Sequence, residues 1–300
     1  MAKIAIIGSN GQLGSDIKAL LSDDHDIVPL EHDTFLVEDK GLVISTLEEI
    51  KPDFVINTAA LHNCAECEEN PQQAFLINGT ALKYLSDACN AIDATLFHFS
   101  TDYIFGIDQS RSEPYLETDI PGPVQVYGVT KLAGEAILKA YCKKYFCLRT
   151  SGLYGLKGTK AKKYANFIEM MIALGTDAMN KEEKLPSAAD QILTFNPTTE
   201  IAKVVKSLLA STEYGLYHAV CGGFSSRSNF VRAIFENLNM PVEVVDVESA
   251  YFKPTYEQPK FSALSNAKLQ SMGIELPDWR TVLEEYLQAR EKRINETSTI

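Results

Sequence analysis

The sequence has no long apolar run and little positive charge. No stretch of its 300 residues approaches the roughly 18 consecutive apolar residues that a membrane-spanning helix needs. It has 28 lysines and arginines against 40 aspartates and glutamates, which gives a formal net charge of −12. A protein that binds nucleic acid needs a basic surface, so this balance argues against such a partner. The apolar segment at the start is too short for a signal peptide, which predicts a cytoplasmic protein without membrane contact.

Cysteine is sparse and scattered. The six cysteines form no framework of disulfide spacing, and Cys64 and Cys67 make a single Cys-x-x-Cys. That pair lacks the second pair of a zinc site and the context of a redox motif. We therefore predict reduced thiols with mostly structural roles. The sequence also contains no internal repeat and no low-complexity segment.

The first 150 residues alternate regularly between two hydrophobic patterns. Short apolar runs predict strands at 3–7, 27–30, 54–57, 95–100 and 146–150. Helical spacing predicts helices at 12–21, 42–50, 72–90 and 127–145. Strand and helix at this rhythm predict an α/β fold of the Rossmann type, a doubly wound parallel sheet covered on both faces.

The pattern loosens after Ser151, which predicts a smaller C-terminal lobe that binds substrate. Helices are predicted at 166–174, 198–209, 228–238 and 279–290, with a strand at 216–220 and a weakly patterned stretch at 176–189. The predicted domains are a dinucleotide-binding domain at 1–151, joined by elements near 190–220, and a substrate lobe at 152–290. Residues 291–300 are predicted to be a frayed tail.

A glycine-rich turn follows the first strand and opens the first helix. Glycine tolerates positive φ there and lets the backbone approach a pyrophosphate closely. The helix N-terminus adds unpaired amides and the positive end of its dipole. This context predicts a dinucleotide site formed by Gly8, Asn10, Gly11, Gln12, Leu13 and Gly14.

The segment after the second strand governs the choice between two cofactors. Glu31, His32 and Asp33 stand about 20 residues beyond the glycines, where an acidic side chain binds the ribose 2′-hydroxyl. A carboxylate also repels a 2′-phosphate, which favours NADH over NADPH. No arginine stands there, although His32 could accommodate a phosphate, so NADPH stays open. Both acidic residues could equally be surface charges.

A tyrosine and a lysine four residues apart share one face of the predicted helix 127–145. The ammonium of Lys131 would lower the pKa of the Tyr127 phenol and reach the cofactor ribose. Thr101 ends the fourth strand, at the edge where such sheets bind ligands, and its hydroxyl could bind the same carbonyl oxygen that Tyr127 protonates. We predict that Thr101, Tyr127 and Lys131 are catalytic.

Together these motifs resemble the extended short-chain dehydrogenase/reductases and, more narrowly, the dTDP-4-dehydrorhamnose reductases. The resemblance covers nearly the whole chain and rests on the glycine-rich turn and on segments 52–60, 100–105, 127–135, 149–155, 190–198 and 215–218. Ser100-Thr101-Asp102-Tyr103, and Asp190-Gln191 leading to Pro197-Thr198, are specific to the narrower branch.

The resemblance implies an enzyme that uses NADH or NADPH to reduce the 4-keto group of a nucleotide sugar. The foremost reaction is dTDP-4-dehydro-L-rhamnose to dTDP-L-rhamnose, in the biosynthesis of deoxysugars and cell-surface polysaccharide. Carried over by position, Tyr127 is the acid, Lys131 its electrostatic and ribose partner, and Thr101 the residue that orients the carbonyl. Ala59 and Ala60 would line the adenosine–pyrophosphate channel, and Asn78 would lie beneath the cofactor. Dimers formed by a helix pair are frequent on this scaffold, which leaves a homodimer open.

The departures from the branch lie on the substrate side. Gly152 replaces a tryptophan, Cys64-Ala65 a valine–aspartate pair, and Gln258-Pro259 an arginine–proline pair. Asp16 matches one position of a magnesium contact found in some members, but no partners are identifiable, so no metal site is predicted.

Two other functions stay open at this point. One is an NAD-dependent epimerase or dehydratase on the same scaffold, and the other is a non-catalytic regulatory subunit that binds a nucleotide. Four lysines within 157–163 could meet substrate phosphates or form a solvated loop. His98, inside a strand, is predicted to be a packed core residue.

Overall fold

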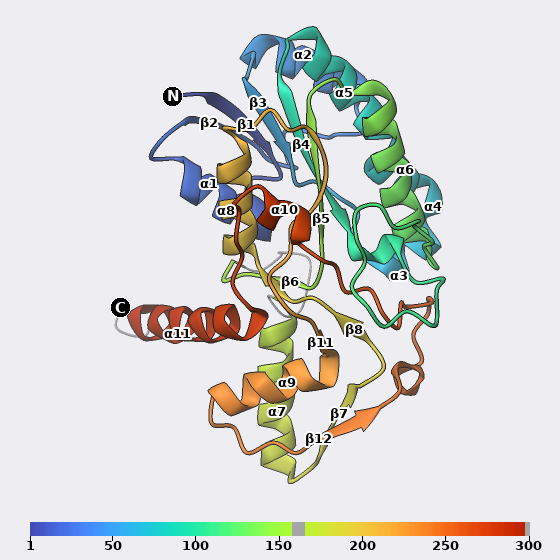
Figure 1. Ribbon diagram of the computed structural model, residues 1–300. Coiled ribbons are helices and arrows are strands. Elements are labelled where there is room, and N and C mark those ends of the chain that lie inside the picture. The colour runs from blue at the N-terminus through green and yellow to red at the C-terminus, as the bar shows by residue number, and fades with distance from the viewer. Residues whose placement is uncertain (158–165, 298–300) are drawn as a thin grey trace.

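A computed structural model describes residues 1–157 and 166–297. Within these residues, six strands form one parallel sheet in the order β10-β5-β4-β3-β1-β2 (Figure 1). Their bounds are β1 Lys3–Ile7, β2 Asp26–Leu30, β3 Phe54–Asn57, β4 Thr95–Thr101, β5 Tyr145–Thr150 and β10 Gly215–His218. This is the predicted doubly wound sheet, and β10 supplies the strand that returns to it from the C-terminal half.

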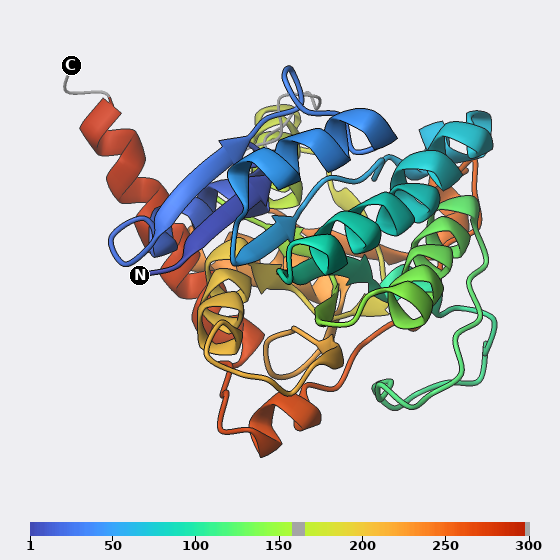
Figure 2. The ribbon, with the colours of Figure 1, turned by 90° about the horizontal axis from the view of Figure 1, so that it is seen from above.

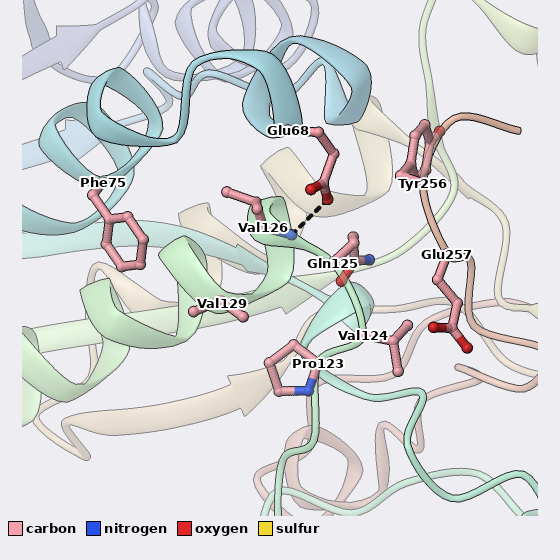
Figure 3. A pocket seen from close by; sticks show the side chains of 9 residues that line it. All are labelled: Glu68, Phe75, Pro123, Val124, Gln125, Val126, Val129, Tyr256 and Glu257. Atoms are coloured by element: carbon pink, nitrogen blue, oxygen red, sulfur yellow. Dashed lines mark hydrogen bonds between the residues drawn. The ribbon is translucent and has the colours of Figure 1, made fainter.

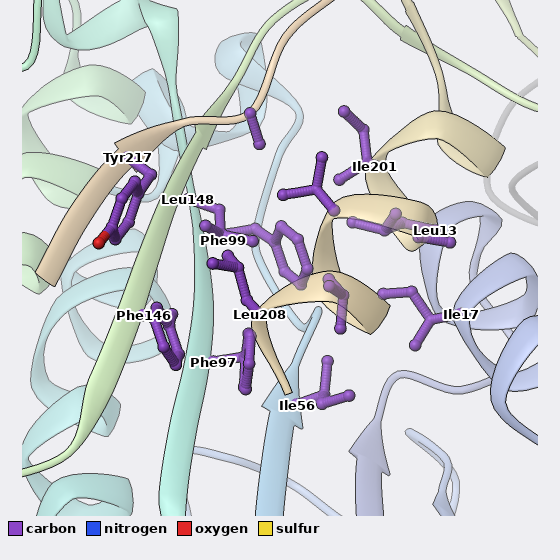
Figure 4. Packing of buried hydrophobic residues seen from close by; sticks show 14 of the residues in the cluster. Leu13, Ile17, Ile56, Phe97, Phe99, Phe146, Leu148, Ile201, Leu208 and Tyr217 are labelled. Atoms are coloured by element: carbon purple, nitrogen blue, oxygen red, sulfur yellow. The ribbon is translucent and has the colours of Figure 1, made fainter. Parts of the chain in front are cut away.

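Helices cover both faces of the sheet, which explains why its strands are continuous apolar runs. On one face α1 (Gln12–Leu21) and α8 (Thr198–Leu208) pack together over aromatic and aliphatic side chains of the strands (Figure 4). On the other face lie α2 (Lys40–Ile50), α5 (Ala81–Ala91) and α6 (Val126–Tyr141). Figure 2 shows α5 and α6 side by side there.

A smaller lobe lies below the sheet in the view of Figure 1. Its helices are α7 (Phe167–Lys181), α9 (Arg227–Asn237) and α11 (Trp279–Thr297), and they share a core with the aromatic rings of Phe195 and Phe230. Short strand pairs complete it: β7 (Leu185–Ala188) with β12 (Val244–Val247), β8 (Ile192–Leu193) with β11 (Ser225–Ser226), and β6 (Leu153–Tyr154) with β9 (Asn196–Pro197). The short α10 (Ala267–Ser271) packs back against β10.

The structure differs from the sequence predictions in the segment between β3 and β4. An unpredicted helix, α3 (Cys64–Glu69), comes first, and the predicted helix 72–90 is divided into α4 (Pro71–Phe75), a π-helical turn (Leu76–Thr80) and α5. Side chains on either side of a π-turn still follow helical spacing, so the sequence pattern does not reveal it.

Two further differences lie in the smaller lobe. The helix predicted at 166–174 continues to Lys181, and the weakly patterned stretch after it contains β7. The terminal helix continues to Thr297, so residues 291–297 of the predicted tail are helical in the structure, and 298–300 lie outside the described residues. Charged residues on all sides of that last stretch hide its helical period, since no face of it is apolar.

Among the described residues, no helix combines the length and apolar character needed to cross a membrane. The six cysteines all lie in this part of the chain; they are buried and form no disulfide with one another.

Candidate active site

The order of the sheet reverses at β1, with β2 on one side of it and β3 on the other. In open α/β sheets the ligand crevice lies beyond the carboxyl ends of the strands at such a point. The loops that follow β1 and β3 are tied together there, because the Thr58 hydroxyl donates a hydrogen bond to the Ile7 carbonyl at 2.8 Å. The glycine-rich turn and the loop after β3 therefore form one rim.

Two of the glycines in the turn are required by close backbone contacts. Gly8 has φ +75°, and a Cβ there would lie 2.6 Å from Thr58 Oγ1. A Cβ on Gly14 would lie 2.2 Å from the Gly8 carbonyl oxygen. Gly11 occupies the N-cap of α1 and has no side chain to cap it. The first amides of α1 are therefore left for a ligand.

Polar groups around the turn fit a dinucleotide. The Ser9 hydroxyl is buried and has no hydrogen-bond partner among the described residues, as expected beside a phosphate site. Asn10 Nδ2 donates to Glu31 Oε2 at 3.1 Å, which holds the carboxylate at the rim. His32 and Asp33 are exposed on the following turn. Of the three predicted selectivity residues, Glu31 is thus the one tied to the glycine-rich turn.

Other predicted cofactor residues have different surroundings. Leu13 is buried in α1, and Gln12 Nε2 donates to the Gly155 carbonyl at 3.4 Å. Ala59 and Ala60 lie half-buried in the loop after β3. Asn78 is buried in the π-turn, where its amide binds both backbone polar groups of Leu61 (2.9 Å each) and the Thr130 hydroxyl (3.1 Å). Asn78 therefore fixes that loop against α6.

The structure brings Thr101 and Tyr127 together. Thr101 ends β4, Tyr127 is the second residue of α6, and their hydroxyls share a hydrogen bond. Close packing sets this position: a Cβ on Gly128 would lie 2.1 Å from the Tyr103 carbonyl oxygen, so glycine lets α6 sit against the turn after β4. The aromatic rings of Tyr103 and Tyr127 meet edge to face, with centroids 6.1 Å apart.

Lys131 lies one turn further along α6 and is buried. Its Nζ is 3.1 Å from Nε2 of His98, and Nδ1 of that ring is 3.3 Å from Asn57 Nδ2. Burial lowers the pKa of Lys131 to about 8. His98 is fully buried, as predicted, and the same cause keeps its pKa well below the usual value.

The expected lowering of the Tyr127 pKa by Lys131 is not found. Burial raises the pKa of Tyr127 instead, and the hydrogen bond with Thr101 opposes that rise. The reason is that the Lys131 ammonium contacts His98, on the strand side of the helix. Residues four apart on a helix share a face, but long side chains on that face can still point to different partners.

Asp102 follows Thr101 and joins three parts of the chain. Its carboxylate is buried and accepts hydrogen bonds from Ser151 (2.9 Å), Ser262 (2.6 Å) and Thr101 (3.2 Å). Burial raises the pKa of this carboxyl, and the three hydroxyls oppose the rise. Asp102 thus holds the end of β4 against segments of the C-terminal half.

A buried ion pair lies behind the site. Arg149 of β5 donates two hydrogen bonds to Glu135 of α6, at 3.0 and 2.7 Å, and a third to His218 of β10 at 3.2 Å. Ser100, next to Thr101, donates to the same glutamate. Sequence reasoning did not single out this network. One signal was available, because Glu135 is acidic and stands four residues after Lys131 on the same helix face.

The two buried histidines predict a loss of stability in acid. Burial and the Arg149 charge lower the pKa of His218 from 6.5 to about 3, so the folded chain takes up its proton later than the unfolded chain. The stability that neutral His218 contributes to the fold is complete above pH 6.5. It falls by about 1.4 kcal/mol per pH unit as the pH drops from 6.5 toward 3. His98 adds a contribution of the same sign.

Urea unfolding of wild type and His218→Gln between pH 4 and 7 measures this effect. Glutamine keeps one donor and one acceptor without a titrating ring, so the variant's profile should be flatter. His32→Gln, on an exposed turn, is the control that should keep the wild-type slope. Parallel profiles for wild type and His218→Gln would contradict the prediction.

A cavity of about 430 Å³ opens beside the start of α6 (Figure 3). Glu68 of α3 accepts a hydrogen bond from the Val126 amide at 2.8 Å and so caps the helix. The N-cap residue Gln125 makes no side-chain cap, and both polar atoms of its buried amide lack a hydrogen-bond partner in the described chain. Glu68 therefore positions the helix end that carries Tyr127. On the far side the cavity reaches Tyr256 of the C-terminal half.

The lysines of 157–163 and Asp16 were considered above for substrate phosphates and for magnesium. Lys157 is exposed, while Lys160, Lys162 and Lys163 lie outside the described residues. Asp16 accepts a hydrogen bond from the Thr198 hydroxyl, and burial raises its pKa. It thereby links α1 to α8.

The fold and the geometry at the carboxyl edge of the sheet define a dinucleotide-binding α/β protein. The paired hydroxyls of Thr101 and Tyr127 lie at the same edge as the glycine-rich turn. A family profile described as the RmlD substrate binding domain matches residues 2–292, and the chain belongs to that family.

The following relatives match over nearly their whole length. The spore coat polysaccharide biosynthesis protein SpsK of Bacillus subtilis is 31% identical over 97% of this chain and 98% of its own. The crystal structure of a dTDP-4-dehydrorhamnose reductase from Clostridium acetobutylicum is 32% identical, with a TM-score of 0.89 over 96% of this chain and 99% of that one. That of the reductase from Bacillus anthracis, in complex with NADP, is 31% identical, with a TM-score of 0.87 and the same coverage.

Proposed function

We propose that this protein is an NAD(P)H-dependent oxidoreductase that reduces the 4-keto group of a nucleotide sugar, converting dTDP-4-dehydro-L-rhamnose to dTDP-L-rhamnose. The observation that carries the proposal is the meeting of the Thr101 and Tyr127 hydroxyls at the carboxyl edge of the sheet, beside a glycine-rich turn, in a chain of this family. Relatives of about 30% identity that bear the name of this reductase support it.

Each candidate residue has a role that follows from its surroundings. The glycine-rich turn, Ser9 and Glu31 would hold the dinucleotide, and its reduced nicotinamide would be the source of hydride for the carbonyl carbon. The Thr101 hydroxyl donates to Asp102 at 3.2 Å in the chain without ligand, and it would turn that proton to the substrate carbonyl oxygen and so orient it, while its oxygen still accepts the Tyr103 amide at 3.2 Å. Tyr127 gives its proton to the carbonyl oxygen. Because burial raises its pKa, the phenol keeps that proton across neutral pH until the oxygen becomes basic. Lys131, buried beside His98, supplies positive charge on the strand side of α6.

The two alternative functions fit the site less well. An epimerase must oxidise the sugar before it reduces it, and a dehydratase needs further acid–base residues at the end of β4, where Asp102 is the carboxylate. Its oxygens are already occupied by the hydroxyls of Thr101, Ser151 and Ser262, so it acts as a structural acceptor. A regulatory subunit would not need the pairing of Thr101 with Tyr127.

The position of Glu31 predicts a preference for NADH. Its carboxylate, held by Asn10, would accept a hydrogen bond from the ribose 2′-hydroxyl and repel a 2′-phosphate. Glu31→Ser should therefore shift the ratio of kcat/KM for NADPH over NADH upward by about tenfold or more, since a lost charge-assisted hydrogen bond and a relieved repulsion act in the same direction. Steady-state kinetics with both cofactors measure the ratio, and Glu38→Ser is a control beyond the turn. A ratio that does not move would assign Glu31 to the surface.

The decisive assay follows the absorbance of the reduced nicotinamide. The chain is mixed with NADH, and separately with NADPH, and with dTDP-4-dehydrorhamnose generated in place. Oxidation that depends on the sugar and yields dTDP-rhamnose supports the proposal. Cofactor binding without oxidation, for this and other 4-keto nucleotide sugars, would favour the regulatory subunit. Light scattering of the same preparation tests whether the chain forms a homodimer, and fractionation of the producing cells tests the cytoplasmic location.

A further inference from the structure

Arg227 forms no ion pair within the described residues of a chain rich in carboxylates. Arg111, Arg149, Arg232, Arg280 and Arg290 each form an ion pair with an aspartate or glutamate. For Arg227 the described part of the chain provides no such pair. Its Nε is buried and has no hydrogen-bond partner there. A half-buried guanidinium in that state is costly unless an anion joins it.

The backbone of Arg227 is fixed by two elements of the C-terminal half. It is the first residue of α9, directly after β11, and its amide donates to the Gln191 carbonyl at 3.0 Å. β11 pairs with β8 through Ser226 and Ile192, which sets the direction in which the helix starts. Ser226 caps α9 by accepting from the Asn229 amide at 3.2 Å. The position of the arginine is therefore built into the fold.

The side chain crosses from this lobe to the active-site edge of the sheet. Arg227 Nη2 lies 3.5 Å from the hydroxyl of Tyr103, and the guanidinium carbon lies 5.4 Å from the centre of the Phe167 ring. Tyr103 in turn meets Tyr127 edge to face, as described above. Tyr127, Tyr103 and Arg227 thus follow one another in space, with the proton donor at one end and the cation at the other.

Among the described residues, no group around Arg227 forms an ion pair with it. Asp102 is near enough for the Arg227 charge to lower its pKa against the effect of burial, but the Asp102 oxygens bind three hydroxyls and no guanidinium nitrogen. Gln191 and Gln258, on the same wall, bind each other through their neutral amides. The charge of Arg227 lowers the pKa values of Tyr103 and Tyr256 against the effect of burial, which places it close to both phenols. The planar Arg227 guanidinium, which has an unpartnered Nε donor among these neutral groups, is suited to bind a phosphate.

A hexose joined to a nucleotide carries its diphosphate on C1, across the ring from C4. With the C4 carbonyl at Thr101 and Tyr127, that diphosphate points away from the hydroxyl pair. We propose that Arg227 binds the diphosphate of the nucleotide-sugar substrate and so sets the distance from the anion to the reacting carbonyl. This rests on the proposed function for the identity of the sugar, while the anion site itself does not require the reduction to occur.

Nucleotide binding to the full chain tests the site without turnover. Calorimetry with dTDP and with dTMP is run on wild type, Arg227→Gln, Arg227→Lys and Arg232→Gln. Losing a charge-assisted hydrogen bond should weaken dTDP binding by about 10-fold to 100-fold in Arg227→Gln. Arg227→Lys should bind dTDP with an affinity between those of wild type and Arg227→Gln, because lysine keeps the charge but cannot donate two parallel hydrogen bonds. Arg232→Gln, on the same helix but paired with Asp246, should bind like wild type.

Steady-state kinetics of the same variants distinguish the anion site from the proposed function. In the reductase assay Arg227→Gln should raise KM for the sugar by a similar factor and leave kcat within a few-fold, with cofactor affinity unchanged. Wild-type affinity for dTDP in Arg227→Gln, or no binding of dTDP by wild type, would overturn the anion site. Arg227-dependent binding of dTDP with no reduction of any keto sugar would instead overturn the proposed function and leave the site standing. Sugar reduction by Arg227→Gln with an unchanged KM for the sugar would overturn the anion site and leave the proposed function standing.

Discussion

Tyr127→Phe should lower kcat by about 10²-fold to 10⁴-fold, the range that a positioned general acid contributes. The substitution removes one oxygen and keeps the ring, so the edge-to-face contact with Tyr103 and the packing of α6 at Gly128 remain. Cofactor affinity and thermal stability should therefore match those of wild type. Stopped-flow measurement of a single turnover, together with fluorescence titration of the reduced cofactor, separates the chemical step from binding.

The matched control for this loss is Tyr141→Phe. Tyr141 ends the same helix and is exposed, far from the strand ends. It should keep full activity. Turnover within a few-fold of wild type in Tyr127→Phe would remove Tyr127 as the acid and leave Thr101 as the hydroxyl to examine.

The pH dependence of the reduction rate is a second test of Tyr127 as the acid. Since burial raises the pKa of Tyr127, the protonated phenol persists well above neutral pH, and loss of the acid form should not limit the rate there. Lys131, whose pKa is lowered to about 8 by burial, is the group expected to shape the alkaline limb in the chain without ligand.

The parts of the site that could be predicted from sequence are those that depend on local pattern. The turn Gly8–Gly14 was recognisable because one strand, one turn and one helix contain the whole device. Thr101 ends a buried strand, and Tyr127 opens a helix with a lysine one turn later. Each of these signals spans a few residues.

What could not be predicted depends on contacts between distant segments. The partner of Lys131 is His98, which lies 33 residues away, and Asp102 is held by Ser262, which lies 160 residues away. No local period encodes either pair. Arg227 is likewise an ordinary helix-starting arginine in the sequence, and its place beside Tyr103 follows only from how β8 and β11 pair. The π-turn that positions Asn78 was hidden because it interrupts the helix without changing which face is apolar.

Arg149→Met should lower the free energy of unfolding by about 3–5 kcal/mol, the cost of removing one partner from a buried ion pair. Glu135 would then keep a buried charge with only the Ser100 hydroxyl to bind it, and His218 would lose its donor. Strand β5, helix α6 and strand β10 meet at this pair, so the loss should also loosen the support of Thr101, next to Ser100. Chemical denaturation measures the stability, and the activity of the remaining folded protein measures the support.

The double variant Arg149→Met/Glu135→Leu should recover part of that loss, because removing both charges leaves no carboxylate stranded in the core. The control is Lys184→Met, which breaks the exposed pair with Glu243 and should cost less than about 1 kcal/mol. A double variant as unstable as Arg149→Met would mean that packing volume, rather than an uncompensated charge, sets the cost. In that case the network would support Thr101 by filling space beneath it, and Glu135→Gln should leave the activity of the folded enzyme unchanged.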